Sequence, residues 1–216
     1  MSCLIGPRRG SRTACRGAAT EGIGKEGRSE MSANEVSIPT TGEEIVEHLL
    51  AQHQQIKVLF GHVADAHGEH KQELFDDLVG LLAVHESVEE TLVHPLAERE
   101  LDDGEQVVPA RLAEEQEATE ALAHLYDLGV THADFNTELA ALRDAVAAHA
   151  EAEEELEFVQ LRAVVDPEQL KSMMTAMEAV AALSPIPAPN LLLGPPLAVF
   201  DRVRAAVRDA AKGAPA

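Results

Sequence analysis

The chain has 216 residues, of which 45% are hydrophobic, so we expect one main domain with additions. This composition excludes wholesale disorder, and no apolar run reaches the roughly 18 residues that a membrane span needs. The formal net charge of −21 would repel phosphate backbones and anionic lipids, so we expect neither a nucleic acid nor a membrane as partner.

The first 30 residues are basic and contain both cysteines, Cys3 and Cys15. We interpret residues 1–40 as a disordered N-terminal segment, in which 1–30 is a tail or sequence translated upstream of a true start at Met31. No apolar stretch follows the basic residues, so they do not form a secretory signal. The remaining residues have neither a disulfide nor a thiolate ligand, which predicts a cytoplasmic protein.

Stretches rich in Ala, Leu, Glu and Gln predict a helical domain over residues 41–164. We expect helices at about 43–66, 70–100, 109–128 and 134–163. The breaks between them fall at Gly68, at Asp102-Asp103-Gly104 before Pro109, and at Gly129. Because short links join antiparallel neighbours, the predicted fold class is all-α, an up-down-up-down four-helix bundle.

Residues 165–216 are predicted to form a C-terminal helical extension with a proline-rich linker. Asp166 is a suitable N-cap, and Pro167 suits the first position of a helix. The stripe expected to face the core in this helix consists of Leu170, Met173, Met177 and Val180. A last amphipathic stretch runs through Phe200, Val203 and Val207, where we expect a lid or an interface.

Helical wheels place three of the ten histidines, His53, His85 and His149, within apolar stripes. Glu89 and Glu153 follow His85 and His149 by one turn, so each pair shares a face. The same wheels place His48, His62 and His94 on the opposite faces. The stripes are Val46, Leu49, Ile56, Phe60 and Val63 in the first helix, Leu74, Leu78, Leu81, Val88, Leu92 and Leu96 in the second, and Phe135, Leu142, Val146 and Leu156 in the fourth.

The motif HxxxEE occurs at His85 and again at His149, which indicates one helix hairpin used twice about a pseudo-twofold axis. A single histidine on an apolar face is usually a hydrogen-bonded core residue, but two buried carboxylates without a cation would cost several kcal/mol each. Both carboxyl pKa values should then be raised. Lys57, one turn from His53, could pair with only one of them. Imidazole and carboxylate without sulfur suit iron, manganese or zinc.

From about Glu43 to Leu161 the chain resembles the hemerythrin-like, HHE cation-binding family, with His53, His85-x3-Glu89 and His149-x3-Glu153 each in the expected helix. The resemblance implies a non-haem di-iron centre with oxo and carboxylate bridges. The three histidines would be terminal ligands, and Glu89 and Glu153 would bridge the irons. Members of the family carry or sense oxygen, buffer iron or decompose peroxide.

The third helix departs from the family pattern, because Gln116 stands where a histidine is usual. His124 lies opposite the stripe of this helix, whereas Glu115 lies within it. Glu115 is therefore a third carboxylate donor, an acceptor that orients an imidazole, or uninvolved. The stripe itself consists of Val108, Leu112, Thr119, Leu122 and Tyr126.

Fewer imidazole ligands leave more coordination positions open, and anionic donors favour the higher oxidation state of iron. Both effects favour reaction with dioxygen or hydrogen peroxide over reversible oxygen carriage. We predict a di-iron protein with a catalase-like or oxidative-stress role, without assigning it a catalytic residue beyond the ligands. The alternatives are an oxygen or iron sensor or storage protein without turnover, and a structural bundle that is zinc-loaded or metal-free. Zinc and manganese are the alternative metals.

Overall fold

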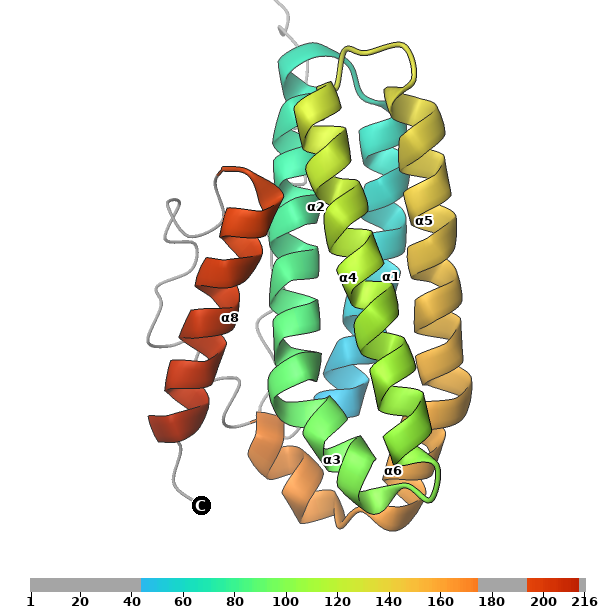
Figure 1. Cartoon of the computed structure of the whole chain (residues 1–216), viewed down its shortest axis with the longest axis vertical. Coiled ribbons are helices and arrows are strands. Elements are labelled where there is room, and N and C mark those ends of the chain that lie inside the picture. Colours follow the sequence, from blue (N-terminus) through green and yellow to red (C-terminus); the bar gives the residue numbers. More distant parts are fainter. Residues whose placement is uncertain (1–43, 175–193, 214–216) are drawn as a thin grey trace, which may run out of the picture. The chain divides into compact units, whose positions relative to one another are not determined.

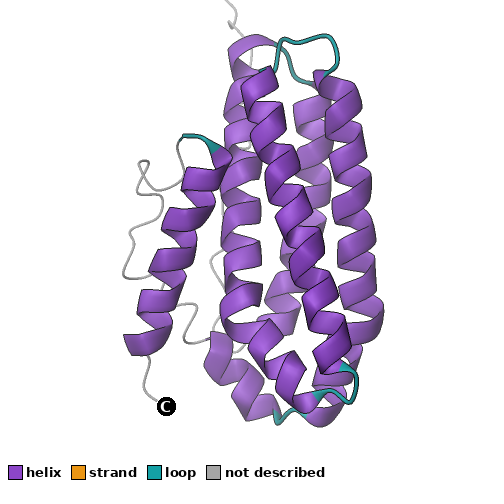
Figure 2. Ribbon diagram, viewed as in Figure 1, coloured by secondary structure: helices purple, strands orange, loops and turns teal. Residues whose placement is uncertain are grey.

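In the computed structural model, four helical rods lie side by side and form an up-down-up-down bundle, as predicted (Figure 1). The structure describes residues 44–174 and 194–213, all within one compact unit. The first and third rods are α1 (Ile45–Asp65) and α4 (Gly104–Leu128). The second consists of α2 (Gly68–Val88), η1 (Glu89–Val93) and α3 (His94–Glu100), and the fourth of α5 (Phe135–Ala152), η2 (Glu153–Glu157) and α6 (Phe158–Val164). The described residues form helices and loops without a strand (Figure 2).

The rods are separated at the predicted breaks, with one change at the start of α4. Gly68 and Gly129 have positive φ values of 63° and 81°, which favour glycine at the start of α2 and after the end of α4. The third helix begins at Gly104 rather than at the predicted Pro109, which lies inside it. A Cβ at Gly104 would lie 2.8 Å from the Cα of Glu98, so only glycine allows this close approach to α3.

Most residues of the predicted stripes form the buried core, including every one on α1. Leu81, Leu92, Tyr126 and Met173 are only partly buried, and Leu112 and Leu156 are exposed, with exposed fractions of 40% and 55%. His48 was predicted to face away from the core but is buried, whereas His62 and His124 are exposed as predicted. The periodicity of the sequence therefore predicts the packed face of α1 but makes that face too narrow.

The C-terminal extension packs against the bundle through its apolar side chains. The backbone N–H of Glu168 donates to Asp166 Oδ1 over 2.8 Å, which confirms the predicted N-cap of a helix that starts at Pro167. The helix α8 (Pro196–Gly213) packs along α2 and also against α4 and η1, with Phe200, Val203 and Val207 buried (Figure 1).

The predictions for residues 1–40, for Met177 and Val180, and for most of the proline-rich linker lie outside the described residues. Among the helices that the structure describes, none combines the length and the apolar character required to cross a bilayer.

Candidate metal centre

Two π-helical turns carry the bridging carboxylates predicted from the sequence. The N–H of His94 donates to the carbonyl of Glu89, and the N–H of Phe158 donates to the carbonyl of Glu153, each across five residues. A π turn holds one residue more than an α turn, and such turns are frequent at functional sites. Pro95 follows the first turn but no proline follows the second, so proline is not their common cause. Each turn begins at a glutamate of the HxxxEE repeat.

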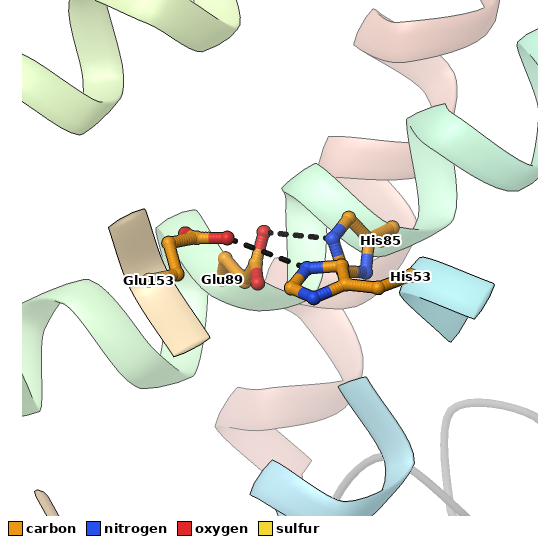
Figure 3. A group of neighbouring side chains, drawn as sticks. All are labelled: His53, His85, Glu89 and Glu153. Atoms are coloured by element: carbon orange, nitrogen blue, oxygen red, sulfur yellow. Dashed lines mark ion pairs between the residues drawn. The ribbon is translucent and has the colours of Figure 1, made fainter. Parts of the chain in front are cut away.

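The first group of donors consists of His53 on α1, His85 on α2, and the carboxylates Glu89 and Glu153 (Figure 3). One ligand atom from each of these residues lies within 4.8 Å of the others. His85 Nε2 is 3.3 Å from Glu89 Oε2, and His53 Nε2 is 3.4 Å from Glu153 Oε2. All four side chains are buried. Two imidazoles and two carboxylates thus converge where the sequence predicts them.

The second group consists of Glu86, Glu89, Glu115 and His149, again within 4.8 Å and again buried. Glu89 belongs to both groups. Glu153 also connects them, because its Oε2 faces His53 and its Oε1 lies 3.3 Å from His149 Nε2. The two carboxylates predicted to bridge therefore each lie between two sets of donors, an arrangement that suits two metal ions.

His94 connects the second group to a further buried carboxylate. Its Nε2 lies 2.5 Å from Glu115 Oε1, and its Nδ1 lies 3.2 Å from Glu157 Oε1. A third possible donor group contains His94, Glu157 and Glu153. The prediction that His94 faces away from the core is therefore wrong. The π turn before it adds a residue, which rotates the following helix by about 100° relative to the wheel. The same shift in the fourth rod explains why Leu156 is exposed.

A polar acceptor holds the far side of each converging imidazole. The Nδ1–H of His53 donates to Glu154 over 2.8 Å, and that of His149 donates to Glu114 over 2.9 Å. His85 donates instead to the neutral Gln52, over 3.1 Å. These bonds fix the ring tautomer and direct Nε2 into the centre, as hydrogen bonds to metal-bound histidine do.

The polar atoms of the centre fit a bound cation. Buried atoms without a hydrogen-bond partner among the described residues include both oxygens of Glu89 and of Glu153, one oxygen each of Glu86, Glu115 and Glu157, and Nε2 of His53 and His149. Within that part of the chain, no lysine or arginine lies within ion-pair distance of Glu89 or Glu153, and Lys57 is exposed. Buried carboxylates are normally paired or bound to a metal, so the centre lacks positive charge that a metal ion would supply.

Without a metal, the pKa values of the centre are strongly displaced. Burial, then the neighbouring carboxylates, raise the pKa of Glu89 well above its usual range, and the pKa values of Glu86 and Glu115 are also raised, chiefly by burial. Burial opposes ionisation of Glu153, but the imidazoles of His149 and His53, 3.3 Å and 3.4 Å from its oxygens, lower its pKa, so the expectation of two raised carboxyl pKa values holds only for Glu89.

The histidines of the centre also differ. Burial and the neighbouring His53 hold the pKa of His85 well below its usual value. Burial has the same tendency at His94 and His149, but nearby carboxylates, which accept hydrogen bonds from these rings, outweigh it and raise both pKa values to about 10. Protonation of His94 and His149 would therefore offset part of the negative charge of the buried carboxylates.

A cavity of about 310 Å³ reaches the centre between α1, α2 and α5. His53, His85, His149 and Glu86 line it. Exposed side chains, among them Lys57, also line the cavity, so it opens to solvent. A small molecule therefore has a path to the donor atoms.

The structure brings together all six residues predicted as metal ligands: His53, His85, Glu89, Glu115, His149 and Glu153. Their role as ligands stays a prediction. Gln116 does not join them, because it is exposed and donates to Glu120 on its own helix over 2.8 Å. Sequence reasoning missed Glu86, His94 and Glu157. Glu86 directly follows His85, and this adjacency to a predicted ligand was the one available signal.

Residues 44–161 match the model of the hemerythrin HHE cation binding domain, which spans all four rods. The chain belongs to this family. The predicted resemblance is thus confirmed, and with it a cation-binding domain whose buried histidine and glutamate groups could hold a metal. Comparison with curated proteins and with solved structures found no match.

Proposed function

We propose that this hemerythrin-like protein holds a non-haem di-iron centre and reacts with dioxygen or hydrogen peroxide. The observation that carries the proposal is the position of Glu153, whose two oxygens face the imidazoles of two different donor groups. Glu89 is shared by the same two groups. Two carboxylates between two sets of donors suit a pair of bridged ions, whereas a single structural ion would need one set.

Iron bound here would supply redox chemistry with oxygen or peroxide, and the protein would position and shield it. His53, His85 and His149 present Nε2 to the centre because Glu154, Gln52 and Glu114 hold their Nδ1 atoms. The surrounding core excludes bulk water, while the cavity between α1, α2 and α5 admits a small oxidant.

The donors favour reaction over reversible oxygen carriage. Glu115 is buried in the centre where family members usually supply imidazole from the third helix, and Glu86 adds another carboxylate. Anionic donors stabilise the higher oxidation state of a metal more than neutral imidazoles do. We therefore favour a catalase-like or oxidative-stress role in the cytoplasm, with dioxygen or peroxide as the small-molecule partner.

The test is the metal content and spectrum of untagged protein purified in air. We expect about two irons per chain, near-ultraviolet bands of oxo-bridged iron, and peroxide consumption that disappears after chelation. Glu153→Gln should lose most of the iron, whereas His62→Ala, at an exposed position of α1, should retain it. A colourless protein that binds only zinc would contradict the proposal.

A second candidate function is an oxygen or iron sensor, which a contact of the C-terminal helix favours. Arg204 of α8 forms a two-bond ion pair with Glu90 of η1, with both N···O distances at 2.6 Å. Glu90 directly follows the bridging Glu89, so a change at the centre would reach α8 through one π turn. If the protein is a sensor, binding of oxygen should change the protection of the α8 amides against hydrogen exchange. The protein should then not consume peroxide.

A further inference from the structure

The cavity between α1, α2 and α5 is larger than dioxygen or hydrogen peroxide requires. Its volume is about 310 Å³. A water molecule occupies about 30 Å³ in the liquid, and both oxidants are only slightly larger than water. Pockets that bind small organic molecules begin at about 300 Å³. The space beside the donor atoms therefore suits a molecule that carries several carbon atoms.

The cavity has a polar end and an apolar wall. His53, His85 and His149 lie at the polar end, where their Nε2 atoms face the centre. Along α1 the lining continues from His53 through the buried Ile56 to Phe60, seven residues or about 10 Å further along the helix. The antiparallel α5 adds the buried Val146 beside them. An elongated ligand would thus place one end at the donors and its body against hydrocarbon.

The charges around the opening do not select an ion. The charged side chains that line the cavity near solvent are Lys57 and Arg143, which are positive, and Glu151 and Glu154, which are negative. Arg143 is already paired with Asp144 over 2.7 Å. Because these charges balance, the favoured ligand is a neutral molecule with an apolar body.

We propose that the cavity binds a neutral organic hydroperoxide, with its O–O group towards His53, His85 and His149 and its hydrocarbon against the apolar wall. The inference rests on the proposed di-iron function and adds a class of substrate to it. In the reaction the O–O bond breaks, one oxygen stays in the product alcohol and the other leaves as water. The two electrons come from two ferrous ions, which become ferric, and the two protons come from solvent, which the open cavity admits.

The binding test uses full-length, zinc-loaded protein, because zinc has no redox chemistry, and cumyl alcohol, the product of cumene hydroperoxide. We expect the alcohol to shift the methyl NMR signals of Ile56 and Val146. Ala147→Phe narrows the cavity from α5 and should weaken binding about tenfold, whereas Ala148→Phe, at the exposed neighbouring position outside the lining, should not. Unshifted signals, or equal affinities of the two variants, would overturn the inference. If Ala147→Phe does not fold, the signals of the parent protein decide alone.

The reaction test mixes iron-loaded, reduced protein without oxygen with cumene hydroperoxide or with hydrogen peroxide. We expect about one cumyl alcohol for every two irons oxidised. Relative to Ala148→Phe, Ala147→Phe should slow the reaction with cumene hydroperoxide about tenfold and that with hydrogen peroxide less than about twofold. Equal slowing with both oxidants would mean that the cavity is only a common entrance, which overturns this inference and leaves the di-iron proposal intact. Iron that neither oxidant oxidises would overturn both.

Discussion

The two ligand-bearing segments, residues 85–94 and 149–158, share a backbone but differ in their side chains. Each begins with a histidine, places a glutamate one turn later and passes into a π turn at that glutamate. After the turn, one segment has His94 and the other has Phe158. His94 contacts Glu115 and Glu157, whereas Phe158 stacks on His53 with ring centroids 5.8 Å apart.

The difference shows how a repeated hairpin produces two unlike halves of one centre. The common backbone places Glu89 and Glu153, the pair proposed to bridge two metals, while the side chains at the variable positions differ around this pair. The segment at His85 adds Glu86 and the imidazole of His94, and the segment at His149 adds Ala150 and the aromatic ring of Phe158 at the equivalent places. Changes at the shared positions should therefore affect both metals, and changes at the variable positions only one half.

The largest effect is expected from loss of a terminal imidazole. His85→Ala and His149→Ala should each lower metal affinity by about tenfold or more, because each removes a donor that a polar neighbour orients. Metal content after dialysis against a weak chelator measures this. His124→Ala, at an exposed position of α4, is the control and should match the parent protein. Full retention of metal in both core variants would mean that these imidazoles are not ligands.

The next effect tests the variable position after the π turn. His94→Ala leaves Glu115 and Glu157 buried without their shared partner, so unfolding in urea should require about 3–5 kcal/mol less. His94→Gln keeps a donor and should recover part of this loss. Equal stability of parent and His94→Ala would mean that the contacts of His94 with Glu115 and Glu157 do not stabilise the fold.

Most of the fold and the convergence of Glu89 and Glu153 could be predicted from the sequence, because both depend on regular spacing. Apolar stripes and the repeated HxxxE spacing follow the α-helical period up to Glu89 and Glu153. Beyond these residues the period changes, and a wheel drawn at constant pitch misplaces His94 and Leu156. A π turn has no reliable signature in a single sequence, so this error was not avoidable.

Glu86 was missed for another reason. A helical wheel places it about 100° from His85, outside the apolar stripe. Four rods around a centre bury more than one narrow face of each helix, so Glu86, Gln52 and His48 are buried as well. The wheel thus identifies the middle of the packed face but not its width.

Stability without metal should depend on pH in one direction above neutrality. Folded Glu86, Glu89 and Glu115 have raised pKa values and hold protons that the unfolded chain releases above about pH 4.5, so their contribution to the free energy of unfolding falls from there towards each raised pKa. His94 and His149, with pKa values of about 10 against 6.5 unfolded, add to the fall between these values.

The opposing groups of the candidate metal centre act at lower pH. The lowered pKa of His85 changes the free energy of unfolding only below pH 6.5, and the lowered pKa of Glu153 changes it only below pH 4.5. The melting temperature of chelated protein should therefore decrease from pH 6.5 to pH 9, and that of the metal-loaded protein should decrease less. Parallel melting curves for the two forms across this range would contradict the assignment of these groups to a metal centre.

A smaller effect is expected at the ion pair that holds α8 to the first ligand segment. Arg204 and Glu90 are partly buried, so Arg204→Met should lower stability by about 1 kcal/mol. Because Glu90 neighbours Glu89, metal should also leave faster in a chelator competition, and this second readout distinguishes a link to the centre from simple packing. Arg208→Met, at an exposed position of α8, is the control. If Arg204→Met leaves the rate of metal release unchanged, α8 covers the bundle without affecting the centre.

The smallest effect is expected at Gln116, although the family pattern would make it the most informative position. Its side chain is exposed and bonded to Glu120, so an imidazole there would point to solvent, and Gln116→His should change neither metal content nor peroxide consumption. The adjacent Glu115→Gln should lower metal content, because it removes a buried carboxylate that His94 holds in place. A gain of iron in Gln116→His would require α4 to rotate by about one residue, or about 100°, on metal binding. That rotation would withdraw Glu115 from the centre. Gln116→His and Glu115→Gln can therefore both affect metal content only if the structure of α4 changes when metal binds.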